Sequence, residues 1–174
     1  IDLKSFKYSS ERVASIESNQ EGYDVWLRTD KARLFGNYIS DIDLNGRMII
    51  KTEDGREDNT EGEYAKVHFS LAINQPLIGG NIYILGEFTG FSIQPDYKMI
   101  YNYSTMQYET SLTLKQGYYN YLYVWVADGD KSGSCYRVEG NYYDARNEYN
   151  IFIYYKPVGG RYDRLLDLYT LPSP

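Results

Sequence analysis

The sequence predicts an all-β fold built as a sandwich. Aromatic residues make up 17% of the 174 residues, and 21 residues are tyrosine, which favours pleated, half-buried surfaces. The segments 67–73 and 108–114 alternate apolar and polar residues with the period of two that marks a half-buried strand. Short apolar runs separated by turn residues, without any long helical period, are typical of a sandwich.

The N-terminal part contains fewer strand signals. Residues 1–20 are polar with scattered apolar residues, so we predict an arm or linker there. Segments 23–29 and 47–51 are the first two predicted strands. The acidic, turn-rich segment 53–63 is the predicted boundary. We therefore expect an N-terminal, strand-bearing extension at 1–62, as the remnant of a longer protein, and a sandwich domain at 63–174.

The second part contains strand signals at short intervals. The predicted strands are 67–73, 82–86, 98–103, 108–114, 118–126 and 148–155, the last of which is stopped by Pro157. For segment 161–171 the pattern leaves a last strand and a short helix open.

Composition limits the classes of partner. The net charge of −6 and the pI of about 4.8 disfavour strong attraction to nucleic acid or anionic lipid. No stretch approaches the roughly 18 apolar residues of a membrane span. The single cysteine, Cys135, excludes an internal disulfide and any multi-cysteine metal site. Because the chain starts at Ile1 rather than at methionine, we expect a mature form or a fragment of a longer protein.

One row of aromatic residues is a candidate binding surface. In the predicted strand 118–126, the side chains of Tyr119, Tyr121, Tyr123 and Trp125 share one face. With Phe91, this row is a candidate platform for stacking on sugar rings. The alternative is that the rings pack between two sheets, which is the commoner outcome for large apolar patches.

A short acidic motif is a candidate calcium site. Asp41, Asp43 and Asn45 precede Gly46 with the spacing of the first half of a calcium loop. The twelfth position of such a loop is normally glutamate but is Thr52 here. A β-turn made by Asn45 and Gly46 explains the same residues without a metal. We expect no other cofactor.

The sequence contains no set of residues that predicts catalysis. The only histidine, His68, lies on the polar side of a predicted strand and is expected to be solvated or at a sheet edge. Cys135 lies in a predicted loop without a nearby base, so it is a poor candidate nucleophile. We therefore predict that the chain is not an enzyme.

A further set of motifs comprises the segments 82–91, 108–114 and 117–121 and the pair Asp128-Gly129. Together they resemble early-set immunoglobulin-like modules, which include the glycogen-binding domains of AMP-activated kinase β subunits. This resemblance implies an immunoglobulin-like sandwich. It also implies, as one alternative, a carbohydrate-binding module that recognises glucan-type polysaccharide through aromatic residues.

A second resemblance covers most of the chain. The segments that carry it are 41–46, 63–69, 139–143, 147–149, 151–157 and 161–165. Together they resemble the C-terminal half of the type IX secretion system plug protein family, formerly a domain of unknown function. This resemblance implies a non-catalytic, exported protein, periplasmic or associated with the outer membrane, whose partner is a translocon that it occludes.

Overall fold

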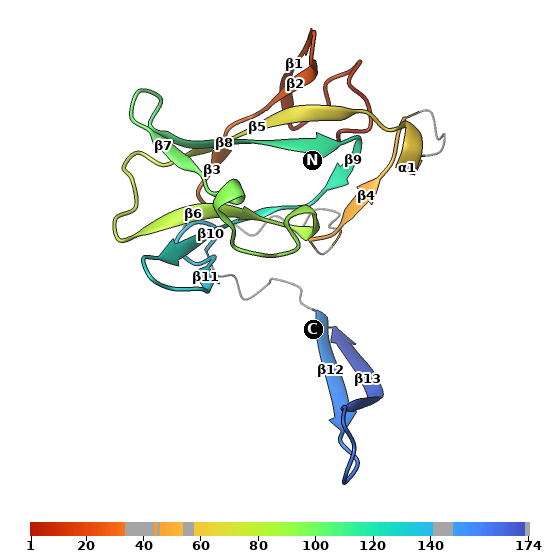
Figure 1. Ribbon diagram of the computed structural model, residues 1–174. Coiled ribbons are helices and arrows are strands. Elements are labelled where there is room, and N and C mark those ends of the chain that lie inside the picture. The colour runs from red at the N-terminus through yellow and green to blue at the C-terminus, as the bar shows by residue number, and fades with distance from the viewer. Residues whose placement is uncertain (34–43, 45, 54–57, 141–147, 173–174) are drawn as a thin grey trace. The chain divides into compact units, whose positions relative to one another are not determined.

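The fold is all-β, which confirms the predicted sandwich class (Figure 1). The computed structural model describes residues 1–33, 44, 46–53, 58–140 and 148–172. The chain divides into two compact units, residues 1–141 and residues 142–174. The division that we predicted at 62/63 differs from this one, because strands before residue 62 belong to the same sheet as strands after it.

The larger sheet has the strand order β1-β2-β5-β8-β7, with β3 also paired to β5. Its strands are β1 (Val13–Asn19), β2 (Gly22–Leu27), β3 (Asp30–Lys31), β5 (Tyr64–Ala72), β7 (Ile100–Asn102) and β8 (Gln107–Lys115). The strands β2 and β3 both run parallel to β5, with β2 paired to its first half and β3 to its end. The other strand pairs of this sheet are antiparallel. The alternation in β5 follows the prediction, since Val67, Phe69 and Leu71 are buried and the residues between them are not.

The second layer contains shorter strands. A three-stranded sheet joins β6 (Gly80–Leu85), β10 (Leu122–Ala127) and β11 (Gly133–Ser134), and β4 (Met48–Ile50) pairs with β9 (Gly117–Tyr119). Ile82, Ile84 and Tyr123 pack in one core with Phe69 and Leu71 of the larger sheet. The only helical turns of the described residues are α1 (Asp58–Glu61), η1 (Glu87–Thr89) and η2 (Pro95–Tyr97).

The segment predicted as one strand, 118–126, is two strands in different sheets. β9 pairs with β4, and the chain then leaves this pair at Asn120 and Tyr121 to join β6 through β10. At the start of β9, the backbones approach so closely that a Cβ on Gly117 would lie 2.4 Å from the carbonyl oxygen of Ile49. A glycine is therefore required at this position for steric reasons.

The predicted arm at residues 1–20 is part of the sandwich. Leu3, Phe6 and Val13 are buried in the core, and the amide of Leu3 donates to the carbonyl oxygen of Gly117 at 2.7 Å. β1 escaped the sequence analysis because only Val13 is deeply buried and the pairing register shifts between Val13 and Ser15. A strand with one inward residue and a bulge shows no period of two.

The smaller unit is a two-stranded antiparallel hairpin. It consists of β12 (Glu148–Tyr155) and β13 (Arg164–Pro172), with a register shift between Ile153 and Tyr154. Of the two structures left open for segment 161–171, the strand is the one observed.

Tyr119 gives the sandwich a pH-dependent stability. Its side chain is 1% exposed, its hydroxyl donates to the carbonyl oxygen of Lys115 at 2.6 Å, and burial raises its pKa to about 12. Because the folded state holds this proton more tightly than the unfolded state, the contribution is complete below pH 10. It is lost as the pH rises from 10 towards 12.

Between pH 9 and pH 11.5, the free energy of unfolding should fall by on the order of 1–2 kcal/mol less in Tyr119→Phe than in the wild type, because phenylalanine has no hydroxyl proton to lose. Urea denaturation across this range measures the slope. Tyr136→Phe, at an exposed tyrosine, is the matched control and should keep the wild-type slope. Equal slopes for Tyr119→Phe and the wild type would contradict the assignment.

Candidate functional site

The aromatic row that the sequence offered either as a sugar platform or as packing between two sheets faces the protein interior. Tyr119 and Tyr123 are buried, and Tyr121 and Trp125 are half-buried against the core. The Tyr121 ring meets the Phe69 ring edge-on at 5.2 Å, and the guanidinium of Arg137 covers the Trp125 ring at 3.9 Å. The row therefore packs the sandwich, which is the alternative that the sequence analysis named as the commoner outcome, and these four residues form no exposed platform.

A buried carboxylate explains why the tyrosines point inward. Oδ2 of Asp30 accepts hydrogen bonds from the hydroxyls of Tyr121 at 2.7 Å and Tyr123 at 2.8 Å, and Oδ1 is paired with Arg12. The Asp30 side chain is 11% exposed. Burial raises the pKa of Tyr121 and Tyr123, and the negative charge of Asp30 raises both further. Both phenols remain protonated donors, so this cluster is suited to holding the fold.

The other buried titratable groups are also engaged. Oε1 of Glu139 accepts from the amide of Tyr123 at 3.0 Å, and Oε2 lies 3.5 Å from Nε of Arg33. Burial raises the pKa of Glu139. Burial, and then the charge of Glu139, raises the pKa of the Cys135 thiol, which disfavours the nucleophilic thiolate.

Phe91 lies apart from the aromatic row. Its side chain is 55% exposed, and its ring contacts Gly46, where a Cβ would lie 3.2 Å from Cε1 of Phe91. The candidate calcium ligands Asp41, Asp43 and Asn45 lie outside the described residues. Within the described ranges, no group of three or more histidine, cysteine, aspartate or glutamate residues could hold a metal ion.

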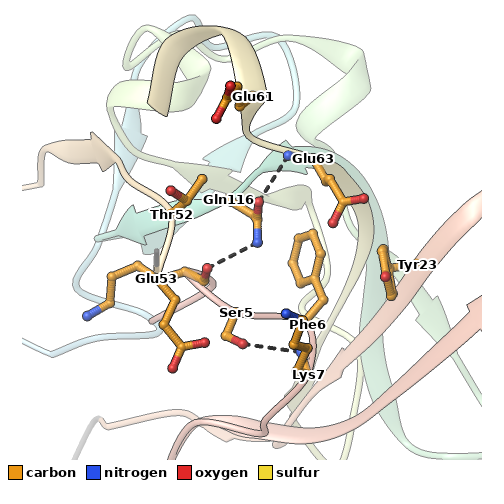
Figure 2. A pocket seen from close by; sticks show the side chains of 10 residues that line it. Ser5, Phe6, Lys7, Tyr23, Thr52, Glu53, Glu61, Glu63 and Gln116 are labelled. Atoms are coloured by element: carbon orange, nitrogen blue, oxygen red, sulfur yellow. Dashed lines mark hydrogen bonds between the residues drawn. The ribbon is translucent and has the colours of Figure 1, made fainter. Parts of the chain in front are cut away.

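A small pocket of about 280 Å³ lies beside the N-terminal segment (Figure 2). At its centre, the Gln116 amide donates from Nε2 to the carbonyl oxygen of Lys4 at 3.0 Å and accepts at Oε1 from the amide of Glu63 at 3.0 Å. Glu53 and Glu61 lie around it. The central side chain thus fastens three backbone segments together, and this pocket is best understood as part of the scaffold.

A larger groove crosses the outer face of the larger sheet. It has a volume of about 890 Å³ and lies over β2, β5, β8 and β7. On one side, the rings of Trp26 and His68 stack in parallel, with 4.7 Å between centroids and 6° between planes. Nε2 of His68 lies 2.7 Å from Oδ1 of Asp24. His68 is thus half-buried on an interior strand, neither solvated nor at an edge as we had expected.

The opposite side and the floor of the groove come from different strands. Ile100 and Tyr103 are 72% and 77% exposed and form the second side. Ser70 donates to Oγ1 of Thr29 at 3.0 Å on the floor, beside Glu109 and Ser111. Sequence reasoning missed this groove. Its one available signal was the polar alternation of His68 and Ser70, which placed both residues on one face without indicating which strand lay beside them.

The hairpin of residues 148–172 exposes apolar side chains on both faces. We call these residues the hairpin surface. They are Tyr149, Ile151, Phe152, Ile153, Tyr154, Tyr155, Leu165, Leu166, Leu168, Tyr169 and Leu171. The pairs Ile151–Tyr169 and Phe152–Leu168 are adjacent across the two strands, so they point to opposite faces. A partner that covered both faces would therefore remove apolar surface from contact with water.

The chain is similar to a hypothetical protein from Parabacteroides merdae ATCC 43184, known from a crystal structure, with 41% sequence identity and a TM-score of 0.94. The match covers 99% of this chain and 43% of that protein, so this chain spans less than half of its length. Neither a family model nor a curated protein matches this chain. In the part of the chain that the structure describes, no helix is long and apolar enough to cross a membrane.

The Asp30 cluster leads to a stability prediction. We expect Asp30→Ala to lower the free energy of unfolding by about 3–5 kcal/mol, because Arg12 and both tyrosine hydroxyls lose a partly buried partner. Urea denaturation at pH 7 measures the change.

The matched control is Asp128→Ala, at an exposed carboxylate that accepts a 3.3 Å hydrogen bond from Nδ2 of Asn81. It should change stability by less than about 0.5 kcal/mol. Equal losses in the free energy of unfolding for the two variants would contradict the prediction that the buried cluster stabilises the fold more than an exposed carboxylate does.

Proposed function

We propose that this chain is a non-catalytic, exported protein-interaction module, part of a plug protein that occludes an outer-membrane translocon of the type IX secretion system. The observation that carries the protein-interaction role is the hairpin surface. The resemblance to the plug family supports the choice of translocon and the placement in the periplasm or at the outer membrane.

The hairpin is a sheet of only two strands, β12 and β13. Two strands without a third strand or a covering helix are marginally stable in water. In an ordinary half-exposed hairpin, apolar residues would lie on one face only, whereas here Ile151 and Phe152 are neighbours in sequence and lie on opposite faces. Large contiguous apolar patches on exposed surfaces mark interaction sites. A partner that covers both faces would stabilise the hairpin.

The edges of the hairpin favour a protein partner. Each strand of the pair has one side that carries no strand pairing within the described unit. An unpaired strand edge presents amide and carbonyl groups that a strand of another protein can pair with. Aromatic residues such as Tyr149 and Tyr169 are enriched at protein interfaces. A protein with exposed strands, as expected for a translocon channel, has the complementary chemistry.

The hydrogen bonds of the buried and partly buried polar side chains support a non-catalytic role. Asp30, Glu139 and Gln116 all make hydrogen bonds that hold the fold. The thiol of Cys135 is held in its protonated form. These groups are occupied as structural partners, and the proposal assigns none of them to chemistry.

We expect Phe152→Thr combined with Leu168→Thr to reduce co-purification of the protein with the translocon by at least about tenfold, the equivalent of 1.4 kcal/mol. Threonine keeps β-propensity, so the change removes apolar surface from one face of the hairpin and spares its strands. The measurement is quantitative co-purification from detergent-solubilised native outer membranes.

A second pair, Ile151→Thr with Tyr169→Thr, tests the other face and should have a similar effect. The matched control, Ile78→Thr with Tyr136→Thr, removes two exposed apolar side chains outside the hairpin. Full retention of the translocon by both hairpin variants, or an equal loss with the control, would contradict the proposed function.

A further inference from the structure

We propose that the groove on the outer face of the larger sheet binds a neutral polysaccharide chain. This site is separate from the hairpin surface, so it does not depend on the protein-interaction role. It also differs from the aromatic row and Phe91, the residues that the sequence indicated for sugar binding.

The sheet register builds the groove from large sides and a small floor. Trp26 is paired with His68 across β2 and β5, and His68 is paired with Ser111 across β5 and β8. Ile100 is paired with Glu109 across β8 and β7. Paired residues lie on the same face of a sheet. Small side chains, Ser70 and Ser111, therefore lie between the stacked rings and the exposed pair Ile100 and Tyr103.

The strands under the groove disfavour an extended peptide as the ligand. β5 is paired on one side with β2 and β3 and on the other with β8, and β8 is paired with β5 and β7. Their backbone amides and carbonyls serve the sheet, so strand addition is available only at a sheet edge. A ligand on this face must be recognised through side chains. This favours a molecule that carries its own dense array of hydroxyl groups.

The polar side chains of the groove are already held in place. Glu109 accepts from Nδ2 of Asn102 at 3.0 Å through Oε2 and from Oγ1 of Thr105 at 2.7 Å through Oε1. Each carboxylate oxygen has a further lone pair, so the fixed carboxylate can accept from a ligand hydroxyl. Prior ordering of these groups lowers the entropic cost of binding.

The two sides of the groove suit the apolar face of a sugar ring. A pyranose presents C–H groups on its face and hydroxyls at its edge, and aromatic side chains offer flat apolar surface. In the sheet order, Trp26 on β2 and Ile100 on β7 lie on opposite sides of Glu109 on β8, and Tyr103, which follows β7, also lines the groove. A sugar ring could pack against either side while its hydroxyls reach Glu109 and Asn102. This division into flat apolar sides and a hydroxyl-binding floor is the central geometric argument.

Charge and size define the class of polysaccharide. The carboxylate of Glu109 lines the groove, the carboxylate of Asp24 lies behind it at 2.7 Å from the lining residue His68, and the chain carries a net charge of −6. Both disfavour sulfated or uronic acid polymers. The volume of about 890 Å³ lies near the upper end of ligand sites, which span roughly 300–1,000 Å³. The ligand is thus a run of neutral sugars.

Affinity electrophoresis in native gels tests this proposal, with glycogen, barley β-glucan, xylan or galactomannan as the neutral probe and alginate as the anionic one. We expect at least one neutral polysaccharide to retard the wild type. Ser111→Tyr fills the groove without removing a native contact, and Trp26→Ala removes one side. Each should weaken binding at least about tenfold, equivalent to 1.4 kcal/mol.

Two controls make the test specific. Thr113→Tyr adds the same side chain to the same strand and face outside the groove, and Phe91→Ala removes the exposed ring elsewhere. Both should bind like the wild type, and urea denaturation should show Ser111→Tyr and Thr113→Tyr equally folded. No retardation by any neutral probe would overturn the proposal. So would equal binding by Ser111→Tyr and Thr113→Tyr, or stronger retardation by alginate than by every neutral probe.

Discussion

The buried carboxylate of Asp30 is the interaction on which the sandwich depends. Asp30 lies in β3 of the larger sheet, and its partners Tyr121 and Tyr123 lie at and just after the point where the chain crosses into the second layer. Arg12, immediately before β1, supplies the compensating charge. A carboxylate at this depth is stable only with such partners, because an unpaired buried charge costs several kcal/mol. The cluster therefore selects the arrangement in which all three segments meet.

This constraint also decides the role of the aromatic residues. A tyrosine buried in a core needs a partner for its hydroxyl, and Asp30 provides one for two tyrosines at once. The rings can then fill the space between the sheets, as Tyr121 does against Phe69. The aromatic surface left for binding comes from other strands, with Trp26 on β2 and Tyr103 beyond β7. The packing tyrosines thus belong to the second layer, and the aromatic residues of the proposed binding groove belong to the larger sheet and the segment after β7.

Local patterns predicted the strands that bury one clean face. Segments 67–73 and 108–114 correspond to β5 and β8. They were predictable because every second residue of a half-buried strand is apolar and faces the core. The sequence could not show the break at Asn120, because both strands on either side of it are aromatic and apolar. It could not show the place of residues 1–33 either, because parallel pairing with β5 is set by contacts distant in sequence. The candidate groove depends on that same pairing, so its residues are scattered over three separate parts of the chain. By contrast, the pattern predicted the first hairpin strand at 148–155 but left segment 161–171 open between a strand and a helix, and it did not indicate exposure on both faces.

Parallel pairing of β2 and β3 with β5 sets the order in which the chain can fold. Residues 32–63 separate these partners, so the pairing requires closure of a long loop. The entropic cost of this closure precedes the favourable contacts between the strands. The hydrogen bonds of Asp30 also require Tyr121 and Tyr123, which lie 91 and 93 residues further along the chain. The N-terminal segment therefore completes its contacts only when about two-thirds of the chain is available to fold with it.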